Sequence, residues 1–484
     1  MSTRPRKRSD EDRTKAEEDW LNKLLDFLSY LLRLGRFLFI RRLDPPQLIA
    51  LSFLAVIAVG TALLMLPISV AAEGRISLID ALFTATSAVC VTGLTVVDTG
   101  SYFSTFGQAV ILALIQVGGL GIMTLSTSLV IVLGRRMGIK GWAIMRDVLD
   151  HEEVSTLRHL ITYIVKMTLV IELSGTVILF IRFVLSQHSP GEAFYLALFH
   201  SVSAFNNAGF SLYSDSLVRY QGDLTLNLTA SALIILGGLG FLVVADLQDY
   251  LRGWGKKNAP RYALSVHTKI VLTTTVGLIL GGAVLIYVLE STNVLKDLPF
   301  KNRILASYFQ SVTTRTAGFN TLDIGALSDA TLLTVILLMF TGASPGSTGG
   351  GIKTTTFAIL VTATIAMLAD RDQPRVFKRL IPREAVHKAI SVTILSISIL
   401  IFFTVLLLVT EGMPFIKVAF ETVSAFATVG LSTGITPALS VAGKMLVIIL
   451  MYIGRIGPLT LALAIGGREE KATYEYPEEK VMVG

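Results

Sequence analysis

A segment of twelve residues that recurs four times constrains the fold of this chain more than any other feature. The copies are FTATSAVCVTGL at Phe83–Leu94, FHSVSAFNNAGF at Phe199–Phe210, YFQSVTTRTAGF at Tyr308–Phe319 and FETVSAFATVGL at Phe420–Leu431. Their glycines are spaced by about 110 residues, a period that indicates an internal repeat. Each copy lies between long apolar runs and joins helix-forming residues to a turn and a glycine. This pattern predicts a half-helix that enters the membrane and returns as an extended strand.

The predicted return strands have only a few physically acceptable surroundings. Non-helical backbone at membrane depth is tolerated only where protein covers it or where it lines a watery path. Four matching copies therefore predict loops that meet on one axis, where rings of carbonyl oxygens replace the hydration shell of a small cation. The alternatives are re-entrant loops of a transporter without a central pore, or turns at the membrane surface. The residues expected to form this filter are Val91, Thr92, Gly93, Asn207, Ala208, Gly209, Thr316, Ala317, Gly318, Thr428, Val429 and Gly430.

The composition indicates an integral membrane protein. Of the 484 residues, 52% are hydrophobic, and the mean hydropathy is +0.66. In such a protein we expect the net charge of +7 to lie in cytoplasmic loops, so it does not indicate nucleic-acid binding. The single cysteine, Cys90, excludes an intramolecular disulfide and a cysteine-based metal cluster. Because the first 20 residues are strongly charged, we expect no cleavable signal peptide.

The predicted fold class is an all-α membrane protein. Four tandem units, each an outer helix, a re-entrant pore loop and an inner helix, are expected to surround one pore with pseudo-four-fold symmetry. We place unit 1 at residues 45–134, unit 2 at 135–250, unit 3 at 251–370 and unit 4 at 371–467. The expected spans are Gln47–Pro67, Phe106–Leu133, Leu160–Leu185, Leu224–Leu247, Val266–Leu289, Ala389–Thr410 and Ala442–Ile465, with one more starting at Ala330.

The two ends of the chain are predicted to form cytoplasmic tails, residues 1–44 and 468–484. Between Trp20 and Ile40 the apolar residues follow helical spacing but are interrupted by Lys23, Arg33 and Arg36. This pattern predicts an amphipathic helix on the inner membrane face, with a partner-binding helix as the alternative.

The basic residues predict the orientation of the chain. They cluster in the loops between units, for example at Arg135, Arg136, Lys140, Arg146, Arg158, Arg252, Lys256, Lys257, Arg261, Arg371, Arg375, Lys378, Arg379, Arg383 and Lys388. The other loops are nearly free of Lys and Arg, apart from Lys296, Lys301 and Arg303. The positive-inside rule therefore places both termini and the inter-unit loops in the cytoplasm, and the pore loops enter from outside.

The inner span of unit 3 is interrupted by the sequence TGASPGSTGGGIKTTT at Thr341–Thr356. Its glycines and proline cannot continue a helix, so we expect an irregular loop, residues 341–353, that faces the pore cavity. Its depth below the filter makes it a candidate gate. It is not a phosphate-binding P-loop, because Ile352 separates Gly351 from Lys353 and no strand precedes it. The candidate gate residues in it are Gly346, Ser347, Thr348, Gly349, Gly350, Gly351 and Lys353.

Four charged residues outside this loop are candidates for the ion path. Arg455 lies within the last span, where we expect it to face a wet or paired environment and to oppose cations below the filter. The alternative is an arginine that snorkels to the membrane interface. Asp98, Asp215 and Asp323 follow their filter glycines closely and are expected at the outer mouth, where carboxylates concentrate cations. The alternative is that they are ordinary solvated loop residues.

Three motifs carry a resemblance to a known family. They are SVTTRTAGFNT at Ser311–Thr321, GASPGSTGGGIKTTTF at Gly342–Phe357 and IGRIGPLTL at Ile453–Leu461. Together with the four-unit pattern from Pro45 onward, they resemble the Trk/Ktr/HKT superfamily of potassium transporters. Eight expected spans without an extra leading helix pair, and the closing YEYPEEKVMVG, are more similar to KtrB-type than to TrkH-type chains.

The resemblance implies potassium uptake across the plasma membrane (the inner membrane) and no enzymatic activity. Glycine at all four filter positions implies a preference for potassium, the loop matching Gly342–Lys353 is implied to gate the pore, and Arg455 to stand beneath the filter. The family further implies a homodimer in membrane lipid on a cytoplasmic KtrA-like RCK ring that binds ATP or ADP, and stimulation by sodium. No organic cofactor is expected in this chain. The competing functions are a sodium-coupled carrier of another solute and an ATP-driven pump.

Overall fold

The structure is a computed structural model that describes residues 45–71, 75–134, 155–253 and 263–461. For residues 122–134 and 155–160 only the backbone is described. The predicted amphipathic helix at 20–40, the tail at 468–484, the basic residues between 135 and 154, and Lys256, Lys257 and Arg261 lie outside these ranges. In the described ranges the chain is almost entirely helical, as the sequence predicts.

The outer helices are long and apolar because each must cross the hydrocarbon of the membrane. Each meets the length and hydropathy expected of a membrane span, and only 22–33% of each spanning segment is buried in the protein. Their remaining surface carries exposed leucine, isoleucine and valine, which suits contact with lipid tails. These helices are α2 (Pro45–Leu64), α7 (Ser155–Leu185), α11 (Val266–Glu290) and α15 (Arg383–Glu411).

The pore helices are shorter, and their C-terminal halves are buried. Small side chains allow them to approach the outer helices closely. The hydroxyl of Ser201 donates to the carbonyl of Glu172 at 2.7 Å, and that of Ser311 donates to Ile279 at 2.7 Å. The pore helices are α3 (Leu78–Val89), α8 (Pro190–Phe205), α12 (Phe300–Thr313) and α16 (Phe415–Phe426).

The inner helices differ most from the predicted spans. Unit 1 has one helix, α5 (Thr105–Gly134), whereas unit 3 has α13 (Asp329–Phe340) and α14 (Thr354–Leu368) on either side of the loop 341–353. The predicted continuous span Leu224–Leu247 is wrong. It consists of α9 (Leu224–Leu239) and α10 (Phe241–Gly253), bent by 104° at Gly240.

A similar correction applies to the last span. The helix α17 (Val441–Ile456) ends before Gly457, so Ala442–Ile465 is not one uninterrupted helix. Gly240 and Gly457 have φ angles of +87° and +91°, which a right-handed helix cannot contain.

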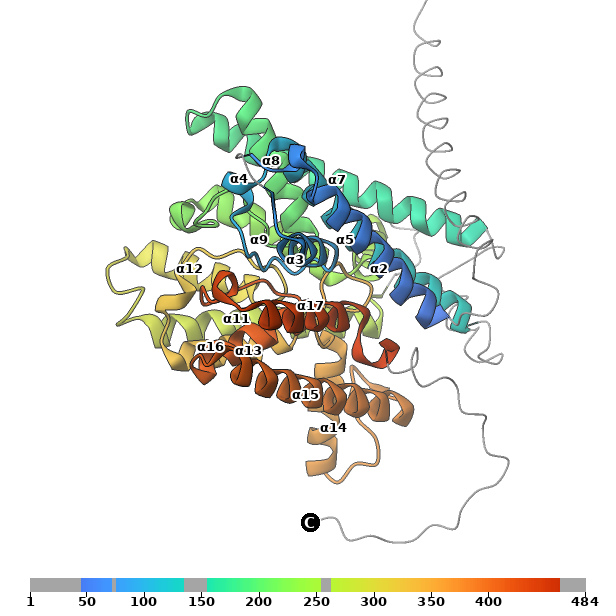
Figure 1. Ribbon diagram of the computed structural model, residues 1–484. Coiled ribbons are helices and arrows are strands. Elements are labelled where there is room, and N and C mark those ends of the chain that lie inside the picture. The colour runs from blue at the N-terminus through green and yellow to red at the C-terminus, as the bar shows by residue number, and fades with distance from the viewer. Residues whose placement is uncertain (1–44, 72–74, 135–154, 254–262, 462–484) are drawn as a thin grey trace, which may run out of the picture.

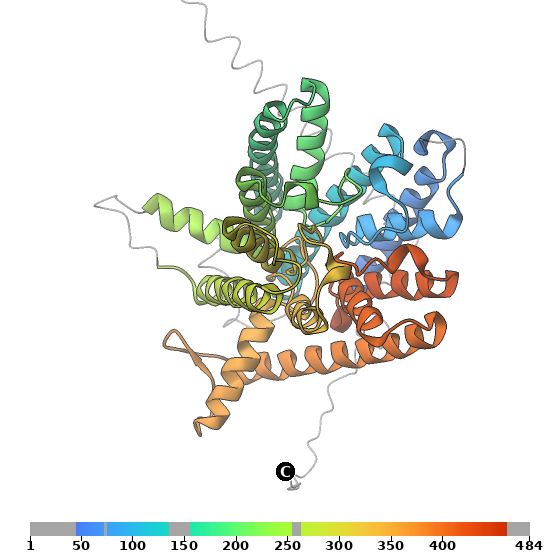
Figure 2. The same ribbon diagram turned by 90° about the vertical axis from the view of Figure 1, so that its left-hand side faces the viewer.

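The four units follow one another around the centre of the molecule, in order from blue to red (Figure 2). Side-chain contacts join neighbouring units. The hydroxyl of Tyr195 in unit 2 donates to Gln108 of unit 1 at 2.7 Å. Lys444 of unit 4 pairs with Asp80 of unit 1 at 2.7 Å, so the last unit contacts the first.

The short elements lie in the connections. The helix α4 (Thr99–Tyr102) and the 3-10 turns η2 (Pro67–Ser69), η3 (Val218–Tyr220), η4 (Ile324–Ala326) and η5 (Thr436–Ala438) belong to these connections. A hairpin of β1 (Arg375–Val376) and β2 (Arg379–Leu380) joins α14 to α15, with Val376 opposite Arg379. The sequence did not predict this hairpin. Together with α14 it projects from the body of the protein (Figure 1).

Candidate ion pathway

The four return strands share one unusual backbone conformation. We define them as residues 91–93, 207–209, 316–318 and 428–430, each following a pore helix. The residue two places before each glycine has a positive φ: 55° at Val91, 59° at Asn207, 71° at Thr316 and 50° at Thr428. The glycines also have positive φ, at 90°, 69°, 78° and 91° in chain order. Residues with a Cβ rarely adopt such angles, so the same backbone turn is built independently in all four units.

The amide groups of the return strands bond back to their own pore helices. The N–H of Thr92 donates to Ser87 O, that of Ala208 to Ser203 O and that of Val429 to Ser424 O, each at 2.8 Å, and Ala317 donates to Thr313 O at 3.0 Å. By contrast, no backbone N–H in the described part of the chain donates to a return-strand carbonyl. Buried carbonyls normally have a partner, so these oxygens are available to a ligand.

The glycines of the return strands contact one another in a closed ring. A Cβ placed on Gly93 would lie closer than 3.0 Å to the carbonyl oxygen of Ala208, the residue before Gly209. The same holds for Gly209 with Ala317, for Gly318 with Val429 and for Gly430 with Thr92. Each strand therefore touches the strand of the next unit, and unit 4 returns to unit 1. The structure brings these predicted residues together around one axis.

Loop 341–353 lies directly against two return strands. A Cβ on Gly349 would meet the hydroxyl oxygen of Thr316, and a Cβ on Gly350 would meet that of Thr428. Thr348 is fully buried and Ser347 is 4% exposed. Only residues without a side chain fit between the loop and the strands, which explains the run of glycines.

Backbone hydrogen bonds hold the loop to the bend between α9 and α10. The N–H of Ser344 donates to Gly238 O at 3.0 Å, and the N–H of Phe241 donates to Gly346 O at 3.1 Å. A Cβ on Gly240 would lie within 2.5 Å of the Pro345 carbonyl oxygen. The inner helix of unit 2 therefore breaks where the loop packs on it. Inside the loop, Lys353 Nζ donates to Gly349 O at 2.8 Å.

Arg455 is buried between three segments, with 4% of its surface exposed. One guanidinium nitrogen donates to the carbonyl of Gly118 in α5 at 2.7 Å, and another donates to the carbonyl of Thr348 in loop 341–353. The alternative of a snorkelling arginine is not what the structure shows, since the guanidinium is enclosed by protein. Arg455 connects the inner helices of units 4 and 1 to the loop.

The three predicted outer acids each have a local structural partner. Asp98 accepts from the N–H of Ser101 at 2.7 Å, and Asp323 accepts from that of Gly325 at 2.9 Å, so both cap short helical turns. Asp215 pairs with Arg219 at 2.7 Å. Partial burial acts to raise the pKa of Asp215, but the hydrogen bonds and positive charge of Arg219 outweigh it and lower that pKa. Asp215 is thus paired with a neighbouring arginine, and a role of Asp98, Asp215 and Asp323 in attracting cations stays a prediction.

One buried polar cluster beside the return strands was missed from the sequence. Glu172 of α7 is 4% exposed and accepts from Asn206 Nδ2 at 3.0 Å and from Gln116 Nε2 at 3.2 Å. Asn206 directly precedes the return-strand residue Asn207. An acidic residue inside an apolar span was the available signal. The cluster joins α5 of unit 1 to the pore helix of unit 2.

The comparisons with known proteins agree with this architecture. A family model described as a cation transport protein, TrkH, matches residues 20–472. The Ktr system potassium uptake protein B of Bacillus subtilis is 42% identical over 92% of this chain and 97% of its own length. The Ktr system potassium uptake protein B of Vibrio alginolyticus is 44% identical over 91% of this chain and 95% of its own length.

Two further matches broaden this picture. The potassium/sodium uptake protein NtpJ of Enterococcus hirae is 38% identical over 92% of this chain and 98% of that protein. The crystal structure of the potassium transporter TrkH from Vibrio parahaemolyticus matches the fold with a TM-score of 0.70 at 19% identity, covering 89% of this chain and 86% of that chain. On the extent of the family match and these identities, the chain belongs to the TrkH family of cation transport proteins.

Proposed function

We propose that this protein takes up potassium across the cell membrane through a gated, channel-like pore. The observation that carries the proposal is the closed ring of four glycines, each in contact with the next return strand. Carbonyl oxygens arranged around a narrow axis replace the water shell of an alkali ion. Two relatives that are 42% and 44% identical to this chain are named potassium uptake proteins, and these names support potassium as the transported ion.

In this proposal an ion loses its water at the return strands. The carbonyl oxygens of residues 91–93, 207–209, 316–318 and 428–430 bind it in successive layers. The pore helices α3, α8, α12 and α16 end just before these strands, so their partly negative C-termini point to the cavity below. Four such helix ends stabilise a cation at the middle of the membrane without a carboxylate.

Loop 341–353 is the proposed barrier below the ring. It packs against Thr316 and Thr428 and is held by Arg455, whose positive charge opposes a cation in the cavity. Opening then requires the loop to move away from α9 and from Arg455. The Lys353–Gly349 hydrogen bond stabilises the loop in the position described here.

The names of the Ktr relatives describe a system with further subunits. We propose that a cytoplasmic RCK-type ring of the KtrA kind, which binds ATP or ADP, controls the loop, and that the membrane subunit is a homodimer. We further propose that both termini are cytoplasmic and that sodium stimulates transport, as the name of the potassium/sodium relative suggests.

Ion flux into liposomes tests the function. The purified chain, with and without its cytoplasmic partner, is expected to carry radioactive rubidium in preference to sodium. It should carry no labelled amino acid and hydrolyse no ATP. Solute uptake coupled to sodium without rubidium flux would instead support the carrier alternative, and ATP hydrolysis by the chain alone would support a pump.

A further inference from the structure

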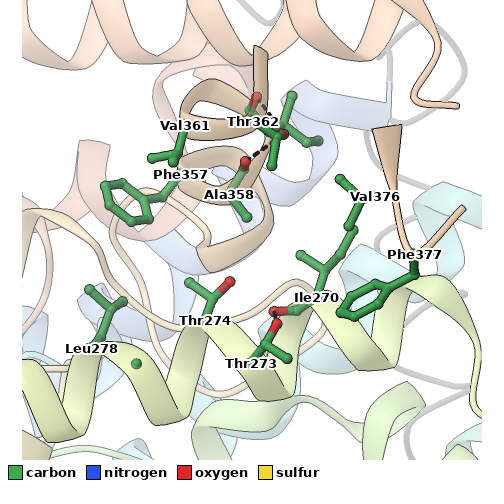
Figure 3. Close-up of a pocket in the computed structure, with 12 residues that line it drawn as sticks. Ile270, Thr273, Thr274, Leu278, Phe357, Ala358, Val361, Thr362, Val376 and Phe377 are labelled. Carbon is green, nitrogen blue, oxygen red and sulfur yellow. Dashed lines mark hydrogen bonds between the residues drawn. The ribbon is translucent and has the colours of Figure 1, made fainter. Parts of the chain in front are cut away.

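An apolar cavity of about 320 Å³ lies between α11, α14 and the β1–β2 hairpin (Figure 3). Ile270 and Leu278 line it from α11, Phe357 and Val361 from α14, and Phe377 from the hairpin. Two of its three threonines do not supply free hydroxyls, because Thr273 and Thr362 donate to carbonyls of their own helices, Lys269 and Ala358, at 2.7 and 2.8 Å. Apart from Thr274, the other lining residues are apolar. The cavity therefore suits a hydrocarbon group.

The cavity lies beside helix surfaces that suit contact with lipid. It follows the first half of the spanning helix α11, at residues 270–278. Within α14 only Thr354 and Ala366 are buried, while Ile365, Met367 and Leu368 are 56–84% exposed. An apolar helix so sparsely covered by protein is solvated by acyl chains in a bilayer.

The rim of the cavity is basic. Lys269 Nζ lies 6.0 Å from the centre of the Phe377 ring, which itself lines the cavity. Lys378 follows Phe377 in the hairpin turn, and Arg375 and Arg379 occupy its strands, all three exposed. Asp370 and Asp372 precede the hairpin, but no ion pair joins an acidic residue to any of these basic groups in the described part of the chain.

We propose that this site binds an anionic phospholipid, with one acyl chain in the cavity and the headgroup at Lys269 and Lys378. The apolar cavity matches the acyl chain of such a lipid, and the unpaired basic rim matches its anionic headgroup. The site lies at the expected cytoplasmic face, and the cytoplasmic leaflet is the one that carries anionic lipids. A neutral lipid or a free anion would match only the cavity or only the rim.

The position of the site links it to the proposed gate, and this part of the inference rests on the proposed function. Helix α14 begins directly after loop 341–353, and Thr354 Oγ1 donates to Ser344 Oγ of that loop at 2.9 Å. A lipid between α11 and α14 stabilises α14 where it lies. Bound anionic lipid therefore holds the loop closed and lowers basal flux.

The binding test uses native mass spectrometry of the full-length protein after equilibration with phosphatidylglycerol or phosphatidylcholine of identical acyl chains. Two glycines on α11 provide matched variants, because a Cβ on either would have no atom within 4 Å. Gly277 lines the cavity, whereas Gly281, one turn further on, does not. Gly277→Phe should reduce retained phosphatidylglycerol, and Gly281→Phe should retain it as wild type does.

The headgroup is tested with Lys269→Gln combined with Lys378→Gln. A lysine near an anionic lipid surface changes binding by about fivefold, so this variant should lose most of its preference for phosphatidylglycerol but keep its retention of phosphatidylcholine. Rubidium flux by wild type should be lower in phosphatidylglycerol than in phosphatidylcholine liposomes. This difference should shrink in the double variant, which experiences the same bulk surface potential.

Three results would overturn the inference: equal retention of both lipids by wild type, equal retention by the two phenylalanine variants, or a change of the Gly277→Phe variant from dimer to monomer mass with lipid retention unchanged. The last would show that a second copy of the chain covers the cavity. The binding arm does not depend on ion flux. A wild-type protein that retains the lipid but carries no rubidium would refute the proposed function and leave the lipid site intact.

Discussion

At each return strand the chain holds two residues in left-handed backbone conformations, and the first of them is not a glycine. Val91, Asn207, Thr316 and Thr428 take up this conformation in the four units. Such angles cost about 1–3 kcal/mol each and persist where the surrounding structure determines them. The turn directs the amide groups back to the pore helix and leaves the carbonyls free. This residue-scale geometry creates the candidate ion site.

Replacing one glycine of the ring should reduce ion selectivity. Gly430→Ser would place a Cβ closer than 3.0 Å to Thr92 O, at a φ of +91°, so the neighbouring carbonyls must move. We expect the permeability of sodium relative to potassium to rise about tenfold, equal to about 1.4 kcal/mol of lost discrimination, in liposome flux competition.

Gly434→Ser is the matched control. Its φ is +89°, yet no atom lies within 4 Å of a Cβ there, so it reproduces the backbone strain without the contact. Its selectivity should remain that of wild type. An unchanged selectivity in Gly430→Ser would remove Gly430 from the filter.

Removing the guanidinium of Arg455 should increase flux in the absence of the partner. Arg455→Ala loses the hydrogen bonds to Gly118 and Thr348, each worth about 1.5–3 kcal/mol for a charged donor, together with the positive charge. We expect at least a tenfold rise in basal rubidium flux, measured in liposomes. Arg455→Lys keeps the charge but cannot reach both carbonyls, so its basal flux should lie between those of wild type and Arg455→Ala. Wild-type flux in the alanine variant would contradict a role in gating.

At the scale of elements, most boundaries follow from local sequence. The outer helices α2, α7, α11 and α15 lie where long apolar runs predict them, because hydrophobicity sustained over a membrane thickness has few other structural solutions. The bend at Gly240 was not predicted, since a single glycine in an apolar run is compatible with a continuous helix. The bend depends on loop 341–353, which is distant in sequence and packs against it.

Shortening the loop should open the pathway. Deleting Gly349–Gly351 removes the residues that fit against Thr316 and Thr428, while the hydrogen bonds of Ser344 to Gly238 and of Phe241 to Gly346 can still form. We expect basal rubidium flux without the partner to rise about tenfold or more. Size-exclusion chromatography and thermal unfolding of the variant serve as folding controls. Low flux in a folded variant would show that the loop is not the barrier.

At the scale of the whole molecule, the closed order of units produces a single axis. The Lys444–Asp80 pair and the contact of Gly430 with Thr92 both join unit 4 to unit 1. The proposed pore needs no chemical step, because the membrane potential acts on the ion directly.

Voltage alone should therefore drive accumulation. One charge crossing 100 mV gains about 2.3 kcal/mol, which corresponds to roughly fifty-fold accumulation of a monovalent cation. Liposomes holding the protein and a set potential, negative inside, should accumulate rubidium to about this ratio for each 100 mV, without ATP or a sodium gradient. Accumulation that depends on a sodium gradient at fixed voltage would indicate coupled transport instead.

The sequence alone predicted the four units, the return-strand residues and the interrupted inner span, because repetition, apolar length and glycine placement are local properties of the chain. Only the tertiary structure decided which strand touches which, where α9 bends, and that Arg455 bonds to Gly118 and Thr348. These features depend on atoms that distant segments bring within a few ångströms of each other. No local pattern in the sequence records that proximity.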